Sequence, residues 1–271
     1  MKKKAFAIVF ASAVLLPAGA GLWFFGRSIP WQSAPFLSPA HTRAESAVGD
    51  LRRMLKEAIG RYRSLDDYTA IFYKEERSGG KWEPEEEIYF KFEKPFKIYM
   101  EWLNTRKIGV QVFYERGFHG NQLAVHLPGF LFQLKPVLFL DRDSPWVREG
   151  SAAYDIEDAG IGKFLLDLTR AVGRGAARRK LLVKYFEKEK DGQSVDITFP
   201  HSSPNEGFFA YRVIVFFDDE TKLPLRMELF DWHNEPMGVY GYKNLKLNAG
   251  PADPEFKRRI HGRLFRIYAH T

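Results

Sequence analysis

The chain contains no cysteine in its 271 residues. This absence excludes a disulfide framework, a thiol nucleophile and an acylated N-terminal cysteine. Catalytic motifs are missing as well: no G-x-S-x-G nucleophile elbow occurs, and the stretch GIGK at 160–163 lacks the spacing of a phosphate-binding P-loop. There is also no internal repeat and no low-complexity tract. The sequence therefore offers no recognisable motif for thiol, hydrolase or nucleotide chemistry.

The residues that remain for metal binding or acid–base catalysis are few and scattered. Seven histidines are spread over the chain, of which His119 and His126 fall in one expected hairpin. A metal site would need further ligands at a fixed geometry. Asp141 and Asp143 flank Arg142, and paired carboxylates can exchange protons, but a solvated loop or a helix cap is the simpler interpretation. We therefore expect no metal, no cofactor and no catalysis, and keep a hydrolase with an unrecognised site as the third hypothesis.

The N-terminus has the pattern of an export segment. Lys2–Lys4 is positively charged, Ala5–Phe25 is an uncharged apolar run, and Ala18-Gly19-Ala20 resembles a signal-peptidase site. The apolar run also approaches the ~20 residues that span a bilayer. Residues 1–26 are therefore expected to be either a signal peptide or an inner-membrane anchor through residues 5–25. Both alternatives place the body outside the cytoplasm, in a periplasm.

Two helices are expected in the body. Residues 27–43 contain three prolines and several serines, which is typical of a linker. Over 44–63, apolar residues recur at i, i+3, i+4 and i+7, and charged residues fill the other side, which predicts an amphipathic helix. A second helix is expected over about 160–173. We interpret both as helices packed on a sheet; a membrane-surface helix is the alternative for the first.

The stretch from Glu87 to Leu103, EIYFKFEKPFKIYMEWL, has the clearest strand pattern in the chain. Its even-numbered positions from 88 to 102 are apolar except for Lys94, whereas its odd-numbered positions carry most of the charge. Alternation with period two indicates strands with one apolar face. Proline gives a ladder no N–H, so we predict a hairpin or bent strand pair that turns at Lys94-Pro95. Burial of this face contributes about 10–20 kcal/mol before opposing terms, and something must cover it.

Further strands joined by short polar turns are expected on both sides of the second helix. They cover 68–77, 107–116 and 121–127 in the first part, and 181–188, 194–199, 208–218, 225–232 and 237–246 in the second. Such runs indicate antiparallel meanders rather than β-α-β units. Residues 128–140 are strongly apolar and predict a covering loop or a short helix pair. The fold class is therefore α+β: one long, curved antiparallel sheet with helices on its concave face.

Several turns and strand ends, taken in order, resemble those of the LolA/LolB-like periplasmic lipoprotein carriers. The matching stretches are RSL at 63–65 before YTA at 68–70, FEKPF at 92–96, DDETKLP at 218–224 and YGYKNLKLN at 240–248. The stretches EPEEE at 83–87 and DAGIG at 158–162 look closer to an uncharacterised bacterial family, a domain of unknown function in the same superfamily. The resemblance covers a half-barrel domain over 44–256 and leaves 257–271 as a basic C-terminal tail.

The resemblance implies an unclosed β-barrel whose cavity takes the acyl chains of lipids or lipoproteins without catalysis. The basic residue that matters in these carriers has two candidates here, Lys94 and Arg106. The implied cavity wall and its cover are apolar. The wall consists of Phe90, Phe92, Phe96, Ile98, Met100, Trp102, Val213, Val215 and Met227, and the cover includes Phe130, Phe132, Phe164 and Leu168.

Charge and aromatic content leave other partners to consider. The formal net charge of +7 would suit anionic headgroups or nucleic acid, and aromatic strands beside basic residues could form a platform for bases. Export and the modest charge of the body argue against nucleic acid, so we expect none. The leading hypothesis is a monomeric, exported carrier of an apolar ligand. The second is a non-catalytic scaffold or adaptor of the cell envelope with a closed core.

Overall fold

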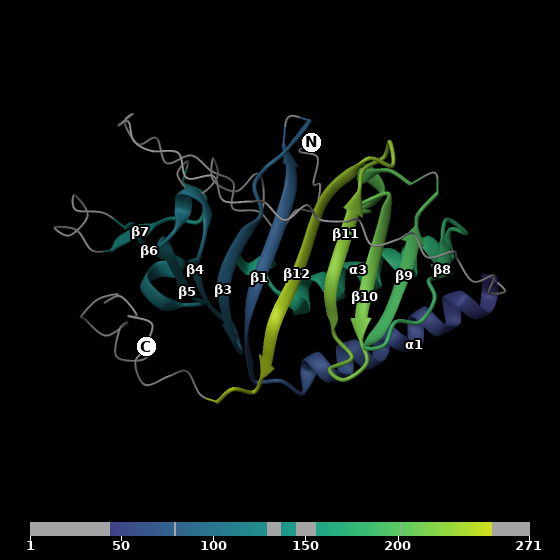
Figure 1. The fold of residues 1–271 in the computed structure, drawn as a ribbon, viewed down its shortest axis with the longest axis horizontal. Coiled ribbons are helices and arrows are strands. Elements are labelled where there is room, and N and C mark those ends of the chain that lie inside the picture. The colour runs from purple at the N-terminus through teal and green to yellow at the C-terminus, as the bar shows by residue number, and fades with distance from the viewer. Residues whose placement is uncertain (1–43, 79, 129–136, 145–155, 201, 251–271) are drawn as a thin grey trace.

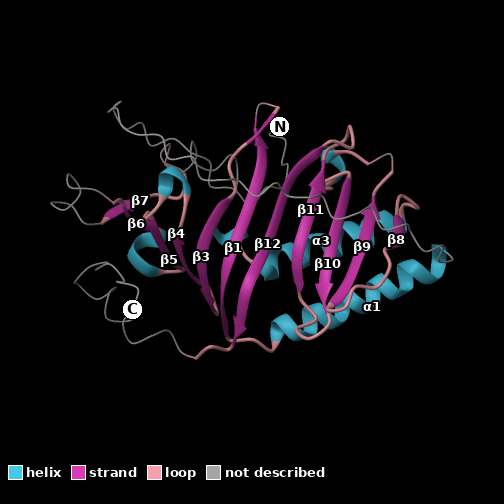
Figure 2. Ribbon diagram, viewed as in Figure 1, coloured by secondary structure: helices cyan, strands magenta, loops and turns pink. Residues whose placement is uncertain are grey.

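The computed structural model describes residues 44–250 apart from 79, 129–136, 145–155 and 201. The expected signal or anchor at 1–26, the linker at 27–43 and the basic tail at 257–271 lie outside these described residues. Within them the α+β architecture is confirmed: one large antiparallel sheet carries two α-helices on one side (Figures 1 and 2). No helix among residues 44–250, as far as they are described, is long and apolar enough to cross a membrane.

The sheet has twelve strands, and β1 lies in its middle between β3 and β12. The strand order is β7-β6-β5-β4-β3-β1-β12-β11-β10-β9-β8, and the short β2 pairs only with β1. The outermost strands β7 and β8 are not neighbours in that order, so the sheet is not closed into a barrel. The strands are β1 (Asp67–Ser78), β2 (Lys81–Trp82), β3 (Glu86–Glu93), β4 (Lys97–Trp102), β5 (Gln111–Glu115), β6 (Leu123–His126), β7 (Leu138–Leu140), β8 (Leu182–Tyr185), β9 (Gly192–Thr198), β10 (Arg212–Asp218), β11 (Pro224–Phe230) and β12 (Pro236–Leu247).

Both expected helices are present. Helix α1 spans Ala44–Arg63, and helix α3 spans Ile161–Ala177, four residues beyond the predicted end. They lie behind β1 and β12–β8 in Figure 1, whereas β4–β7 lie beyond the span of either helix. Short 3-10 helices complete the described structure: η1 (Thr105–Lys107), η2 (Phe118–Asn121), η4 (Ile156–Asp158) and η5 (Pro204–Glu206).

The predicted hairpin is confirmed at β3 and β4. Lys94-Pro95 falls in the turn between them, and cross-strand pairs such as Phe90 with Met100 and Phe92 with Ile98 keep the apolar positions on one face. Burial alternates along the whole of β3, as the sequence pattern requires. The charged odd-numbered positions therefore stand on the opposite face of the sheet.

Several predicted segments differ from the structure. The strand expected over 181–188 spans only Leu182–Tyr185, and the one expected over 208–218 begins at Arg212. The strand expected over 107–116 is shorter, because η1 and a left-handed Gly109 (φ +80°) occupy its first part, so β5 begins at Gln111. The loop or helix pair expected over 128–140 is wrong at its end, because residues 138–140 form the edge strand β7 against β6. A three-residue edge strand has too few positions to show an alternation that the sequence could reveal.

Helix α3 begins against the buried hydroxyl of Tyr68. The first helical amide, that of Ile161, donates a hydrogen bond of 3.1 Å to the hydroxyl oxygen of Tyr68 on β1. The preceding Gly160 has φ +98°, and a Cβ there would lie 2.7 Å from the same oxygen. Only glycine fits this position, because both the backbone conformation and the close approach exclude a side chain. The contact fixes where α3 starts on the sheet.

We expect Tyr68→Phe to lower the free energy of unfolding by about 1–3 kcal/mol, because it leaves a buried helix-terminal amide without its acceptor. Urea denaturation of both proteins measures the difference. Tyr211→Phe is the matched control, since Tyr211 is half-buried and no hydrogen bond of its hydroxyl is formed with the described residues. Equal losses in the two variants would contradict the role of the Tyr68 hydroxyl.

Candidate functional site

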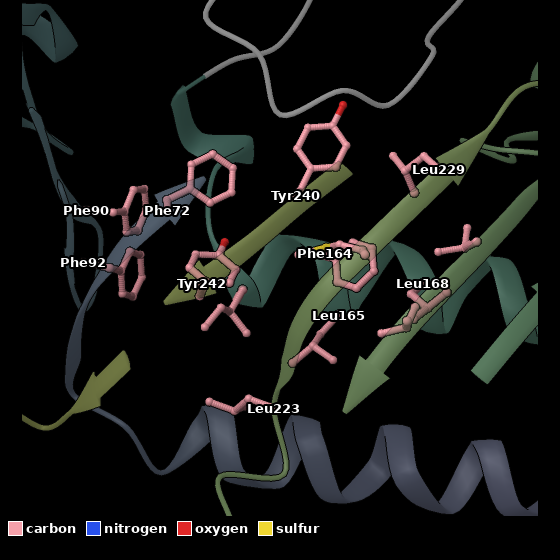
Figure 3. Packing of buried hydrophobic residues seen from close by; sticks show 14 of the residues in the cluster. Phe72, Phe90, Phe92, Phe164, Leu165, Leu168, Leu223, Leu229, Tyr240 and Tyr242 are labelled. Atoms are coloured by element: carbon pink, nitrogen blue, oxygen red, sulfur yellow. The ribbon is translucent and has the colours of Figure 1, made fainter. Parts of the chain in front are cut away.

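The predicted cavity wall lies in the core of the molecule. Its residues on β3, β4, β10 and β11 belong to one cluster of buried side chains, together with Phe164 and Leu168 of α3. Figure 3 shows part of this cluster, with aromatic side chains of the strands gathered next to α3. All of them are at most 3% exposed except Phe96, which is partly buried in the turn between β3 and β4. The structure therefore brings these residues together and packs protein against them, and their contact with a ligand stays a prediction.

Aromatic contacts hold the middle of this wall. The ring of Tyr68 stacks on Phe90 and Phe92, with centroids 5.8 and 5.2 Å apart. Phe92 meets the edge of Phe96 at 5.6 Å, and Phe96 meets Tyr114 of β5 at 5.9 Å. Such pairs contribute about 0.5–1.5 kcal/mol each beyond their area burial. The predicted cover residues Phe130 and Phe132 lie outside the described part of the chain.

An open groove lies between α1 and α3. Its volume is ≈ 490 Å³. Helix α1 contributes residues at spacings of three and four, which share one side of a helix, and α3 contributes a matching set. The lining residues are Arg52, Leu55, Lys56, Ile59, Gly60 and Arg63 of α1 and Thr169, Val172 and Gly173 of α3.

The floor of the groove is continuous with the core. Leu55 and Val172 are buried and belong to the cluster that contains the predicted wall, and Ile59 packs against that cluster. Gly60 and Gly173 lie at open positions, because a Cβ added to either would meet no atom within 4 Å. A groove that is apolar at its base and lacks two side chains at its margin has room for a guest molecule.

The two basic residues singled out from the sequence do not enter this groove. The Lys94 ammonium donates to the carbonyl oxygens of Tyr62 and Arg63 at 3.0 and 2.8 Å, and thus caps the C-terminal end of α1. Burial lowers the pKa of Lys94. Arg106 lies exposed in η1. Lys94 is therefore a structural residue of the helix end.

A buried network of charges was missed by the sequence analysis. Glu86 accepts hydrogen bonds from the Trp102 indole N–H (2.9 Å) and the Lys107 ammonium (2.6 Å), and lies 3.5 Å from Lys74. Lys74 also pairs with Glu76 at 3.2 Å. Burial lowers the pKa of Lys107 and raises that of Glu76. Two cations and two anions satisfy one another here, which suits a structural anchor.

Neither the histidines nor the loop carboxylates assemble a catalytic or metal site in the described residues. His119 stacks on Phe139, with ring centroids 3.8 Å apart, and one of its ring nitrogens lies 2.8 Å from the Gln122 side-chain oxygen. Asp141 accepts a hydrogen bond from the same glutamine. No group of three or more potential metal ligands occurs within the described ranges.

Substitution distinguishes the sealed wall from the open groove. We expect Phe90→Ala to lower the free energy of unfolding by about 3–5 kcal/mol, because it leaves a cavity in packed core. Ile59→Ala, at the half-exposed floor of the groove, should cost about 1 kcal/mol, because water already reaches the site. Urea denaturation measures both, and a Phe90→Ala loss as small as that of Ile59→Ala would show that the wall is not packed.

Comparison with solved structures finds similar chains that differ strongly in sequence. An outer-membrane lipoprotein-sorting protein domain from Vibrio parahaemolyticus is 13% identical, with a TM-score of 0.37 over 80% of this chain and 98% of that chain. A LolA superfamily protein from Nitrosomonas europaea is 10% identical, with a TM-score of 0.34 over 78% and 96%. The lipoprotein LppX from Mycobacterium tuberculosis is 10% identical, with a TM-score of 0.42 over 75% and 97%.

No curated protein matches the sequence. The expectation of an uncharacterised family is nevertheless confirmed, because one family model covers residues 65–261, more than half of the chain. That family is described as a protein of unknown function, DUF1571, and the chain belongs to it.

Proposed function

We propose that this chain is an exported, non-catalytic binding protein that holds the acyl chain of a lipid or lipoprotein between its helices and the inner face of its open sheet. The observation that carries the proposal is the groove between α1 and α3. Its volume of ≈ 490 Å³ falls within the roughly 300–1,000 Å³ typical of small-molecule sites. Its floor belongs to the same core as the predicted wall.

Burial of an acyl chain is sufficient for useful affinity without a pattern of hydrogen bonds. A chain of about sixteen carbons gains about 12 kcal/mol when its methylene groups leave water. Association removes about 4–15 kcal/mol of that gain. An apolar groove with few polar groups therefore suits a ligand of this class better than a sugar or a nucleotide.

Access to the predicted wall requires the helices to separate. The wall residues Phe90, Met100 and Val215 are at most 3% exposed, whereas the groove reaches Leu55 and Val172, which belong to the same buried cluster. In this proposal the acyl chain enters at the groove and extends toward the wall as α1 and α3 move apart. The tight packing also favours the second candidate, an envelope scaffold with a closed core, so the two functions must be distinguished by ligand binding.

The first test is the recovery of a bound ligand. The full chain, purified from membrane-containing cells, is examined by native mass spectrometry, and displacement of a fluorescent fatty acid is measured. We expect an apolar ligand of about acyl-chain mass and competitive displacement, together with no turnover of ester or glycoside reporters. Absence of both a bound ligand and displacement would favour the scaffold instead.

A substitution in the groove tests where the ligand binds. We expect Gly173→Leu to weaken fluorescent fatty-acid binding at least tenfold, because the new side chain fills open space, while stability rises by about 0.5–1 kcal/mol through better helix propensity. Gly49→Leu is the matched control: Gly49 is a glycine of α1 that, like Gly173 of α3, has no atom within 4 Å of an added Cβ, and it does not line the groove. Unchanged binding in Gly173→Leu would locate the ligand elsewhere.

A further inference from the structure

The groove carries an excess of positive charge that the protein itself does not neutralise. Arg52, Lys56 and Arg63 line it, and no aspartate or glutamate does. None of the three forms an ion pair with a described residue, and their side chains belong to exposed residues. Elsewhere on the same helices, Arg53 pairs with Asp50 at 2.7 Å and Arg170 with Asp167 at 3.8 Å. Three cations without an ion pair to a described residue thus line the groove.

A polar atom of one residue that lines the groove also lacks a partner. The Thr169 hydroxyl oxygen is buried and makes no hydrogen bond within the described structure. A helical threonine can satisfy its hydroxyl on the carbonyl one turn earlier, which this one does not do. A buried hydroxyl without a partner costs about 1–3 kcal/mol. It would recover part of that energy by donating to an acceptor on a bound ligand.

The groove combines an apolar floor, a hydroxyl without a partner and cations without ion pairs. These three features suit an amphiphile whose head is anionic and accepts hydrogen bonds. A carboxylate satisfies each element: its oxygens can accept from the Thr169 hydroxyl, the Lys56 ammonium and the Arg52 guanidinium, and charge-assisted hydrogen bonds are the strong ones. In such a complex the cations hold the head while the attached chain lies over Leu55 and Val172, which line the same groove. A neutral or cationic head would leave the charges of Arg52 and Lys56 uncompensated.

We infer that the groove between α1 and α3 binds a long-chain fatty acid, with the carboxylate on Arg52 and Lys56, which lie one turn apart on α1. This inference rests on the proposed function and names the chemical class of its ligand. It also divides the roles of the lining residues: the cations select the head, and Leu55, Ile59 and Val172 hold the chain. Affinity for the head must fall as salt screens the exposed cations.

The test compares two ligands that differ only in the head. Palmitate and hexadecanol are titrated by displacement of the fluorescent probe from the full chain, below their critical concentrations. We expect palmitate to bind roughly tenfold more tightly at low salt, which corresponds to about 1.4 kcal/mol. In the double variant Arg52→Gln/Lys56→Gln this preference should fall to about twofold, while hexadecanol affinity stays the same.

Arg61→Gln is the matched control, because Arg61 is an exposed α1 arginine that does not line the groove. It should leave both affinities unchanged. Thr169→Val should weaken the binding of palmitate a few-fold and the binding of hexadecanol less. Equal binding of palmitate and hexadecanol to the wild type, or an unchanged preference in the double variant, overturns the fatty-acid inference and leaves the proposed function standing. Failure of both ligands to bind overturns the proposed function as well.

Anionic vesicles are used last, to distinguish binding of a single fatty acid from binding to a membrane surface. The same cations could face phosphatidylglycerol headgroups in a bilayer surface instead of one molecule in solution. We expect vesicles to compete only to the extent that they supply free fatty acid. Binding to phosphatidylglycerol vesicles without binding of monomeric palmitate would assign the groove to a membrane surface and overturn the inference.

Discussion

The pairing of β1 with β12 is the constraint on which the rest of the structure depends. It joins the strands that precede α3 to those that follow it, in a register that runs from Tyr68 opposite Leu247 to Glu76 opposite Gly238. Glycine in β12 allows this approach, since a Cβ on Gly241 would lie 2.3 Å from the Tyr73 hydroxyl oxygen. Because the two halves form one sheet, their apolar positions share one face, and the helices lie behind β1 and the strands that follow α3 (Figure 1). Without this pairing each half would expose an additional strand edge.

Contacts at both ends of β1 join it to β3 on one side and to the start of α3 on the other. At one end, Lys74 and Glu76 belong to the buried charge network with Glu86. At the other, Tyr68 holds the start of α3. Removing one partner of a buried ion pair costs several kcal/mol, so the network resists separation of β1 from β3. Helix α1 packs on α3 beside the open groove.

Much of the fold could be predicted from the sequence, because apolar residues recur with the period of two that indicates strands and the period of 3.6 that indicates helices. The alternation through Phe90, Phe92 and Met100 fixed the hairpin and its inner face, and the stripe of α1 fixed the helix bounds. Pairing of β1 with β12 was not accessible, since register between distant strands leaves no local signal. The groove was missed for a related reason: Lys56 and Thr169 are ordinary helix residues until the helices are placed side by side. The predicted wall residues do meet, but they meet as packed core, and sequence alternation alone cannot separate a core face from a ligand-lined face.

The central claim is that an acyl chain lies in the groove between α1 and α3. Methyl-labelled full chain, mixed with stearate that carries a nitroxide near its terminal methyl group, tests this claim directly by paramagnetic broadening in NMR spectra. The account predicts strong broadening of the methyl signals of Leu55, Ile59 and Val172, and reversal when unlabelled palmitate is added. Unaffected groove methyls, or broadening confined to exposed apolar residues elsewhere such as Ile108 and Leu182, would contradict it.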